Sequence, residues 1–214
     1  MIRPLAERVP WLENGDHLDR AEFERRYEAM SDVKKAELIE GIVYMPSPVR
    51  QPEHSNPHFM VITWLGVYNA ATPNTEGGDS GSIRLDLNNE PQPDGFLRFI
   101  EGGNSHIDED RYVAGAPELA AEISASTVSI DLGLKLEVYR RNGVQEYVVW
   151  RVLDEAIDWF VLHGGQYERL PLGADGIYRS EVFPGLWLDA AALIRGDLAT
   201  VLQTLQRGVA QRQK

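Results

Sequence analysis

The segment from residue 117 to residue 143 limits the folds open to this chain more than any other. Residues 117–124 have the pattern of a β-strand, and residues 128–141 have the periodicity of a helix that Asn142-Gly143 would end. A strand and a helix of this kind bury their apolar residues only against further layers of structure. The segment therefore predicts a sheet with at least one helix packed on it.

The other expected elements alternate between helices and strands. Helix patterns cover residues 20–30, 58–71 and a terminal stretch from about Asp197, and Asp19 with Glu22 has capping-box spacing. Strand patterns cover residues 36–45, 82–87, 94–100, 145–152, 156–162, 166–170 and 182–188. The Gly-rich run 77–82 is expected to be a hairpin or a loop. This order predicts an α/β or α+β fold with a mixed central β-sheet.

Composition excludes several classes of protein. A length of 214 residues suits a single domain, with a C-terminal helix at about 196–213. No apolar run approaches the roughly 20 residues that cross a bilayer, and the N-terminal residues lack the apolar stretch of a secretory signal. The chain has no cysteine, so it has no disulfide framework and no thiolate metal site. A cytoplasmic location is expected.

The net charge of −12, from 21 basic and 33 acidic residues, counts against a broad nucleic-acid-binding face. A local basic strip can still exist on an acidic protein. The candidates for such a strip are Arg84, Arg98, Arg111, Lys135, Arg140 and Arg141. For all of these except Lys135, an ordinary solvated position is the default interpretation.

Glu122 lies within the first strand described above, on the same face as the small residue Ala120. The opposite face is apolar and contains Leu119, Ala121 and Ile123. If the strand is central, the Glu122 carboxylate is costly to bury unless a cation or hydrogen bonds compensate. If it is an edge strand, Glu122 simply faces water, and the strand alone does not separate these two interpretations.

Lys135 faces the apolar side of the expected helix. Its neighbours on the helix surface are Val128, Leu132, Leu136, Val138 and Tyr139. An ion pair with Asp131, four residues earlier, contributes only about 0.2–0.5 kcal/mol on an exposed helix, which is too little to justify this position. A lysine directed at a buried carboxylate on the adjacent strand explains it better.

Asp94 opens another expected strand, after Pro91-Gln92-Pro93. On its own it is typical of a turn cap. Together with Glu122 on a neighbouring strand it could hold Mg²⁺, a cation that takes oxygen ligands and keeps several waters. Such an ion polarises a phosphodiester, and Lys135 would orient a water or stabilise charge on the phosphate.

In this order, Pro93-Asp94 and Glu122-Ile123-Ser124 resemble the PD-(D/E)XK nuclease superfamily, in which an aspartate is followed by a glutamate and a lysine one residue apart. Ser124 stands where that lysine would be. The Uma-type restriction-endonuclease family, a branch of this superfamily, carries the lysine on the following helix, where this chain has Lys135. The similarity covers roughly residues 20–190.

Several short segments add to the resemblance, and a few positions depart from it. The matching segments are 37–41, 45–48, 115–119, 126–127, 143–144 and 146–147, together with His58, Asp131 and Tyr139. The departures are Ala125 and Gln145 in place of prolines, Val148 in place of tryptophan, and Arg151-Val152-Leu153, which lacks an Asp-Pro pair. These departures lie outside the expected metal site.

The resemblance implies a restriction-endonuclease-like core and a Mg²⁺-dependent endonuclease that hydrolyses DNA phosphodiester bonds, with Mn²⁺ able to replace Mg²⁺. Asp94 and Glu122 would be metal ligands, and the main-chain carbonyl of Ile123 would be a further ligand. Lys135 would be the displaced catalytic lysine, and Glu37 would position the water or the metal. DNA is the implied partner, and double-strand cutting favours a homodimer.

Other interpretations stay open. His54 and His58 could share a helix face, but Pro57 argues against regular helix there, so capping or packing is the better interpretation for His58. No pair of histidines has HExxH spacing. The acidic charge also allows a catalytically inactive, nuclease-like binding or assembly module. A phosphodiesterase acting on RNA or another phosphodiester is the third alternative.

Overall fold

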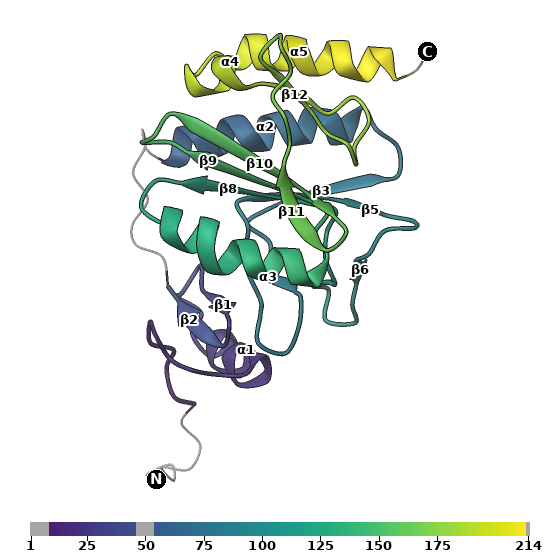
Figure 1. The fold of residues 1–214 in the computed structure, drawn as a ribbon. Helices are drawn as coiled ribbons and strands as arrows, with labels where there is room; N and C mark the ends of the chain where they lie inside the picture. Colours follow the sequence, from purple (N-terminus) through teal and green to yellow (C-terminus); the bar gives the residue numbers. More distant parts are fainter. Residues whose placement is uncertain (1–8, 46–53, 213–214) are drawn as a thin grey trace, which may run out of the picture.

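A mixed β-sheet lies at the centre of the computed structural model, which describes residues 9–45 and 54–212 (Figure 1). Within these ranges the central sheet has six strands in the order β11-β10-β9-β8-β5-β3. Their bounds are β3 Thr75–Asp79, β5 Gly95–Phe99, β8 Leu119–Ser124, β9 Glu146–Arg151, β10 Ala156–His163 and β11 Gln166–Arg169. The β8–β9 pair is parallel and the other pairs are antiparallel, which confirms the predicted mixed sheet.

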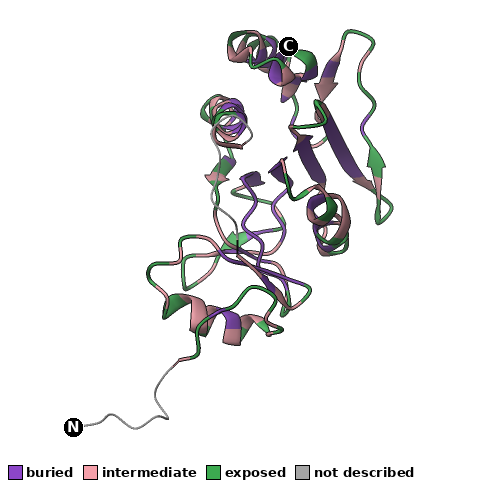
Figure 2. Cartoon of the chain, turned by 90° about the vertical axis from the view of Figure 1, so that its left-hand side faces the viewer, coloured by how far each residue is buried: buried purple, intermediate pink, exposed green. Residues whose placement is uncertain are grey.

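Helices cover both faces of this sheet. α2 (Asn56–Ala70) packs on one face, with α4 (Ala190–Ile194) and α5 (Leu198–Gln211) beyond it, and α3 (Lys135–Asn142) lies on the other (Figure 1). The buried face of α2 is the predicted one, with Met60, Val61, Trp64, Leu65 and Tyr68. The inner strands β5, β8, β9 and β10 are mostly buried between these layers, whereas the edge strands β3 and β11 are mostly exposed (Figure 2).

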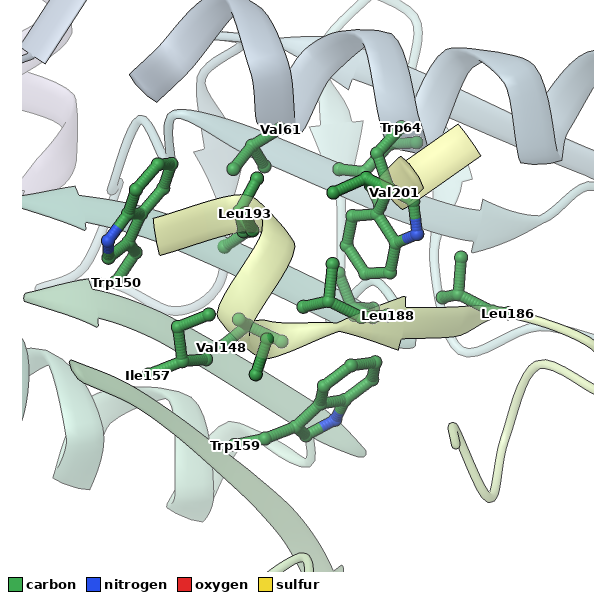
Figure 3. Packing of buried hydrophobic residues seen from close by; sticks show 14 of the residues in the cluster. Val61, Trp64, Val148, Trp150, Ile157, Trp159, Leu186, Leu188, Leu193 and Val201 are labelled. Carbon is green, nitrogen blue, oxygen red and sulfur yellow. The ribbon is translucent and has the colours of Figure 1, made fainter. Parts of the chain in front are cut away.

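The larger hydrophobic core lies between the sheet and the α2, α4 and α5 layer (Figure 3). Trp64 of α2 meets Trp159 of β10 edge to face, with ring centroids 5.8 Å apart. Val148 and Trp150 of β9 belong to the same cluster, and Leu193 of α4 packs against it. A smaller core under α3 includes the rings of Tyr147 of β9 and Phe160 of β10. Both faces of the central strands are therefore apolar, and a charged group between them needs compensation.

Smaller elements complete the fold. The N-terminal part contains α1 (Arg20–Glu28) and a hairpin of β1 (Glu37–Ile39) and β2 (Ile42–Tyr44). Asp19 caps α1 by accepting a hydrogen bond from the Glu22 amide, as predicted. The other short strands are β4 Ile83–Arg84, β6 His106–Ile107, β7 Val113–Ala114, β12 Ile177–Arg179 and β13 Trp187–Asp189. No helix in the described ranges is long and apolar enough to cross a membrane.

Two expected elements are wrong. Residues 36–45 form a hairpin and not one strand, because Glu40 and Gly41 adopt φ values of 54° and 72° that reverse the chain. In the Gly-rich run 77–82, a hairpin or loop is wrong for residues 77–79, which lie in β3, and only residues 80–82 form a loop between strands. A Cβ on Gly78 would come within 2.2 Å of the Phe96 ring, so glycine here permits close packing. Residues 46–48 of the resemblance lie outside the described residues.

Two further elements differ from expectation in detail. The helix expected over 128–141 begins at residue 128 but contains a π-helical segment, η3 (Ile130–Leu134), before α3. α3 ends at Asn142, where Gly143, with a φ of 88°, gives the left-handed cap. Of the strand expected at 182–188, only the last two residues lie in a strand, β13 (Trp187–Asp189), which pairs with β12 (Ile177–Arg179). α5 begins after Asp197, where the terminal helix was expected.

Candidate active site

Strands β5 and β8 bring Asp94 and Glu122 together. Gly95 pairs with Ala121 in the antiparallel register, so Asp94, one residue earlier, lies opposite Glu122, one residue later. Directly opposed residues of an antiparallel pair project from the same face. The amide of Ile123 donates a hydrogen bond of 2.8 Å to Asp94 Oδ2. Asp94 is therefore not a local turn cap, because its carboxylate is bound by the neighbouring strand.

Glu122 is a buried residue of a central strand. β8 lies between β5 and β9, and all its residues are buried, so the edge-strand interpretation is wrong. Lys135 Nζ donates to Glu122 Oε1 at 2.9 Å, and the Tyr139 hydroxyl donates to the same oxygen at 3.1 Å. Glu122 Oε2 has no hydrogen-bond partner among the described residues. One carboxylate oxygen is thus held by helix α3, and the other is available for a further group.

The ammonium group of Lys135 lies among three carboxylates. Its Nζ is 2.8 Å from Glu37 Oε1, 2.9 Å from Glu122 Oε1 and 3.8 Å from Asp131 Oδ1. The side chain is only 4% exposed. The intrahelical pair with Asp131 is the longest of these contacts, so the expected contact with the adjacent strand explains the position of Lys135. The π-helix η3 ends immediately before Lys135, and such segments are frequent at functional sites.

Glu37 reaches the same cluster from β1. Its Oε1 accepts a hydrogen bond of 2.7 Å from the Gln92 amide as well as the contact from Lys135. The backbone of Leu38 exchanges hydrogen bonds with Glu90 in both directions. The hairpin is therefore fixed to the segment that leads into β5, and it carries Glu37 to the carboxylates of the sheet.

Three further residues contact Asp94, and sequence reasoning did not assign them to the site. Lys35 Nζ lies 3.4 Å from Asp94 Oδ1, and His54 Nε2 lies 3.4 Å from Asp94 Oδ2. His58 Nε2 is 3.0 Å from the main-chain oxygen of Asp94 and 3.1 Å from Asp79 Oδ1. The histidine rings stack 5.7 Å apart. The spacing of His54 and His58 was visible in the sequence, but their common contact with Asp94 was not.

The charges of the cluster shift several pKa values. Burial raises the pKa of Glu122 well above its usual range; the charge of Lys135 opposes this shift, and the neighbouring carboxylates add to it. Burial also acts to raise the pKa of Asp94, but the hydrogen bond from His54 and the charge of Lys35 outweigh it and lower that pKa. The pKa of Lys135 is raised, because its three carboxylates outweigh burial.

The donor set fits a hard divalent cation. Four carboxylates (Glu37, Asp94, Glu122 and Asp131) face two ammonium groups (Lys35 and Lys135), which leaves a formal charge of −2 when all are ionised. Among the described residues no group of three or more His, Asp and Glu side chains is arranged to hold a metal ion. Mg²⁺ commonly takes one or two carboxylates and completes its shell with water, so Asp94 and Glu122 alone would be enough to hold such an ion.

Four of the arginines considered for a phosphate-binding strip are engaged elsewhere. Arg84 pairs with Asp108 and Asp110, and Arg98 pairs with Glu76. Arg140 pairs with Glu137 on its own helix, and Arg141 pairs with Glu40. The four side chains that pair with carboxylates do not form a free cationic strip around Asp94 and Glu122.

The fold and this carboxylate–lysine cluster define an α/β protein of the restriction-endonuclease-like class. The chain belongs to the Uma2 family, whose model, described as "Putative restriction endonuclease", matches residues 20–191. Membership supports a nuclease function. No curated protein matches the chain.

A solved structure with the same fold is the "putative nuclease belonging to DUF820" from Anabaena variabilis ATCC 29413. It is 14% identical, with a TM-score of 0.60, over 79% of this chain and 97% of that one. At this identity the likeness shows the fold, which confirms the expected central mixed sheet flanked by helices.

Proposed function

We propose that this protein is a Mg²⁺-dependent endonuclease that hydrolyses phosphodiester bonds of DNA. The observation that supports the proposal most is the juxtaposition of Asp94 and Glu122 on adjacent central strands, with Lys135 2.9 Å from Glu122. Burying this many acidic groups is costly without further cations, and a structural role alone does not require it. The family supplies the reaction class.

Each residue of the cluster has a distinct role in the proposal. Asp94 and Glu122 would hold Mg²⁺, or Mn²⁺ in its place, with the main-chain carbonyl of Ile123 as a further ligand. The bound ion would polarise the phosphodiester and acidify a water molecule. Lys135 holds the Glu122 and Glu37 carboxylates in place, and its charge stabilises the negative charge gathered there. Glu37 would orient a water at the edge of the site.

The second candidate is a nuclease-like module that binds or assembles without cutting. The net charge of −12 and the pairing of Arg84, Arg98, Arg140 and Arg141 with carboxylates favour it, since neither supplies a broad surface for a polyanion. An enzyme acting on RNA or on another phosphodiester would keep the same site. A homodimer would suit double-strand cutting, because each chain carries one cluster.

Nicking of supercoiled plasmid in Mg²⁺ or Mn²⁺ tests the proposal. Wild type is expected to nick, whereas Asp94→Asn and Lys135→Ala are expected to lose at least about 100-fold in rate. Glu137→Gln is the matched control on helix α3, because Glu137 is exposed and pairs with Arg140. Equal rates in all four proteins would refute the assignment, and cleavage of RNA but not DNA would favour the alternative substrate.

A further inference from the structure

Two lysines lie in the carboxylate cluster, but they contact different carboxylates and differ in how firmly their ammonium groups are held. Lys135 is 4% exposed, with two carboxylate oxygens within 2.9 Å and a third at 3.8 Å. Lys35 is 26% exposed, and its only ion-pair contact among the described residues is Asp94 Oδ1 at 3.4 Å. An ammonium group has three donors, so Lys35 keeps donors for another acceptor.

Lys35 is the more solvent-accessible of the two lysines in the cluster. The chain passes from Lys35 through the buried Ala36 to Glu37, and Lys35 and Glu37 contact different members of the cluster, Asp94 and Lys135. A lysine side chain is ordinarily cationic at neutral pH. An anion that approaches Asp94 from solvent therefore meets a charged, partly exposed donor.

We propose that Lys35, and not Lys135, contacts the phosphate group of a nucleic acid bound at Asp94 and Glu122. This inference rests on the proposed function. The contact needs a partly exposed ammonium group whose ion pair is long enough to be exchanged, and Lys35 meets both conditions. Lys135 meets neither, since removing it from Glu122 and Glu37 would leave buried carboxylates uncompensated. Lys135 is then a positioning residue, and Lys35 is the residue that touches substrate.

The salt dependence of nucleic-acid binding separates these roles. The affinity for a short fluorescent DNA duplex is measured by anisotropy over a range of salt concentrations, with Ca²⁺ as the divalent ion. Each phosphate contact contributes about 0.9 to the slope of log K against log salt. Lys35→Met is expected to make that negative slope shallower by about 0.9, whereas Lys35→Arg leaves it unchanged. Lys34→Met is the matched control, because it removes the same charge from the exposed neighbour.

Metal affinity provides a second measurement that a purely structural role for Lys35 would not explain. Lys35→Met removes a positive charge from beside Asp94, and that charge would repel the Mn²⁺ ion. Calorimetry is therefore expected to show Mn²⁺ binding as tight as in wild type or tighter. A parallel loss of metal and DNA affinity would overturn the proposal, since Lys35 would then only shape Asp94. Thermal melting of each variant confirms that the compared proteins are folded.

The outcomes distinguish this inference from the proposed function. If wild type nicks DNA and Lys35→Met retains the wild-type slope, Lys35 does not contact phosphate and the inference fails alone. If wild type neither binds nor nicks nucleic acid, the proposed function fails and the inference fails with it. An equally shallow slope in Lys34→Met would also overturn the inference, because the effect would then come from the protein's net charge and not from a contact made by Lys35.

Discussion

Lys135 and Glu122 form an ion pair of 2.9 Å in which both side chains are only 4% exposed. The pair joins helix α3 to the central strand β8, and Glu37 and Tyr139 add contacts to its two ends. Because buried charges depend on one another for compensation, the stability and the chemistry of this region are coupled. Substitutions at these residues can separate the two contributions.

Removing the Lys135 cation should destabilise the fold, and removing the Glu122 charge as well should recover part of the loss. Lys135→Met leaves Glu122, Glu37 and Asp131 without their common counter-charge, and we expect the free energy of unfolding to fall by about 3 kcal/mol. Adding Glu122→Gln to that variant should recover part of the loss. Urea denaturation measures both. A loss below about 1 kcal/mol for Lys135→Met would show that the carboxylates need no cation for folding.

Glycine-to-alanine changes in two helices should have opposite signs. Gly66 in α2 has no atom within 4 Å of the position that a Cβ would occupy, so Gly66→Ala should stabilise the protein by about 0.5–1 kcal/mol. In α5, the Cβ of Gly208→Ala would come within 2.4 Å of the Gly185 oxygen and 2.6 Å of the Trp187 ring, so this change should destabilise it. Thermal unfolding gives both signs, and stabilisation by both changes would contradict the close approach of α5 to Gly185.

Glu90 should make stability depend on pH. Burial, and then the hydrogen bond with Glu24, raise the pKa of Glu90 to about 8, and Arg84 only partly opposes this. Above about pH 4.5 the unfolded chain loses this proton, whereas the folded protein keeps it up to about pH 8. The free energy of unfolding is therefore highest at low pH and falls as pH rises towards 8. Glu90→Gln should therefore be more stable than wild type by about 1–3 kcal/mol at about pH 8, and by less at about pH 5.

Denaturation at both pH values checks this expectation. Glu109→Gln, which changes an exposed glutamate, is the control and should leave the pH dependence as it is in wild type. An identical stability–pH profile for wild type and Glu90→Gln would mean that Glu90 is ionised in the folded protein throughout this range.

Local sequence patterns predicted the parts of the fold and site that depend on periodicity. The buried face of α2 follows from its apolar spacing, and the core-facing position of Lys135 follows from the helix around it. The same reasoning failed at Glu40-Gly41, where a two-residue reversal interrupts an apolar run, and at β3, where Gly78 is required by the ring of Phe96. Neither is visible without the partner strand.

The residues that surround Asp94, Glu122 and Lys135 were harder to predict than these three. Glu37 entered only through resemblance, because no local pattern relates β1 to α3. Lys35 was missed because it follows Lys34 in a stretch that looks like ordinary solvated surface, and its contact with Asp94 spans 59 residues of sequence. His54 and His58 likewise acquire a common partner only when α2 packs beside β5. These residues were missed because their roles depend on contacts between distant segments, which residue types alone do not reveal.

The position of a bound metal ion tests the central claim most directly. Crystals soaked in Mn²⁺, with data collected at the Mn²⁺ absorption edge, should give an anomalous peak within coordination distance of both the Asp94 and Glu122 carboxylates. The same soak of Asp94→Asn crystals should lose most of that peak. A wild-type map with no peak between these two residues, at a Mn²⁺ concentration that supports cleavage, would contradict the account.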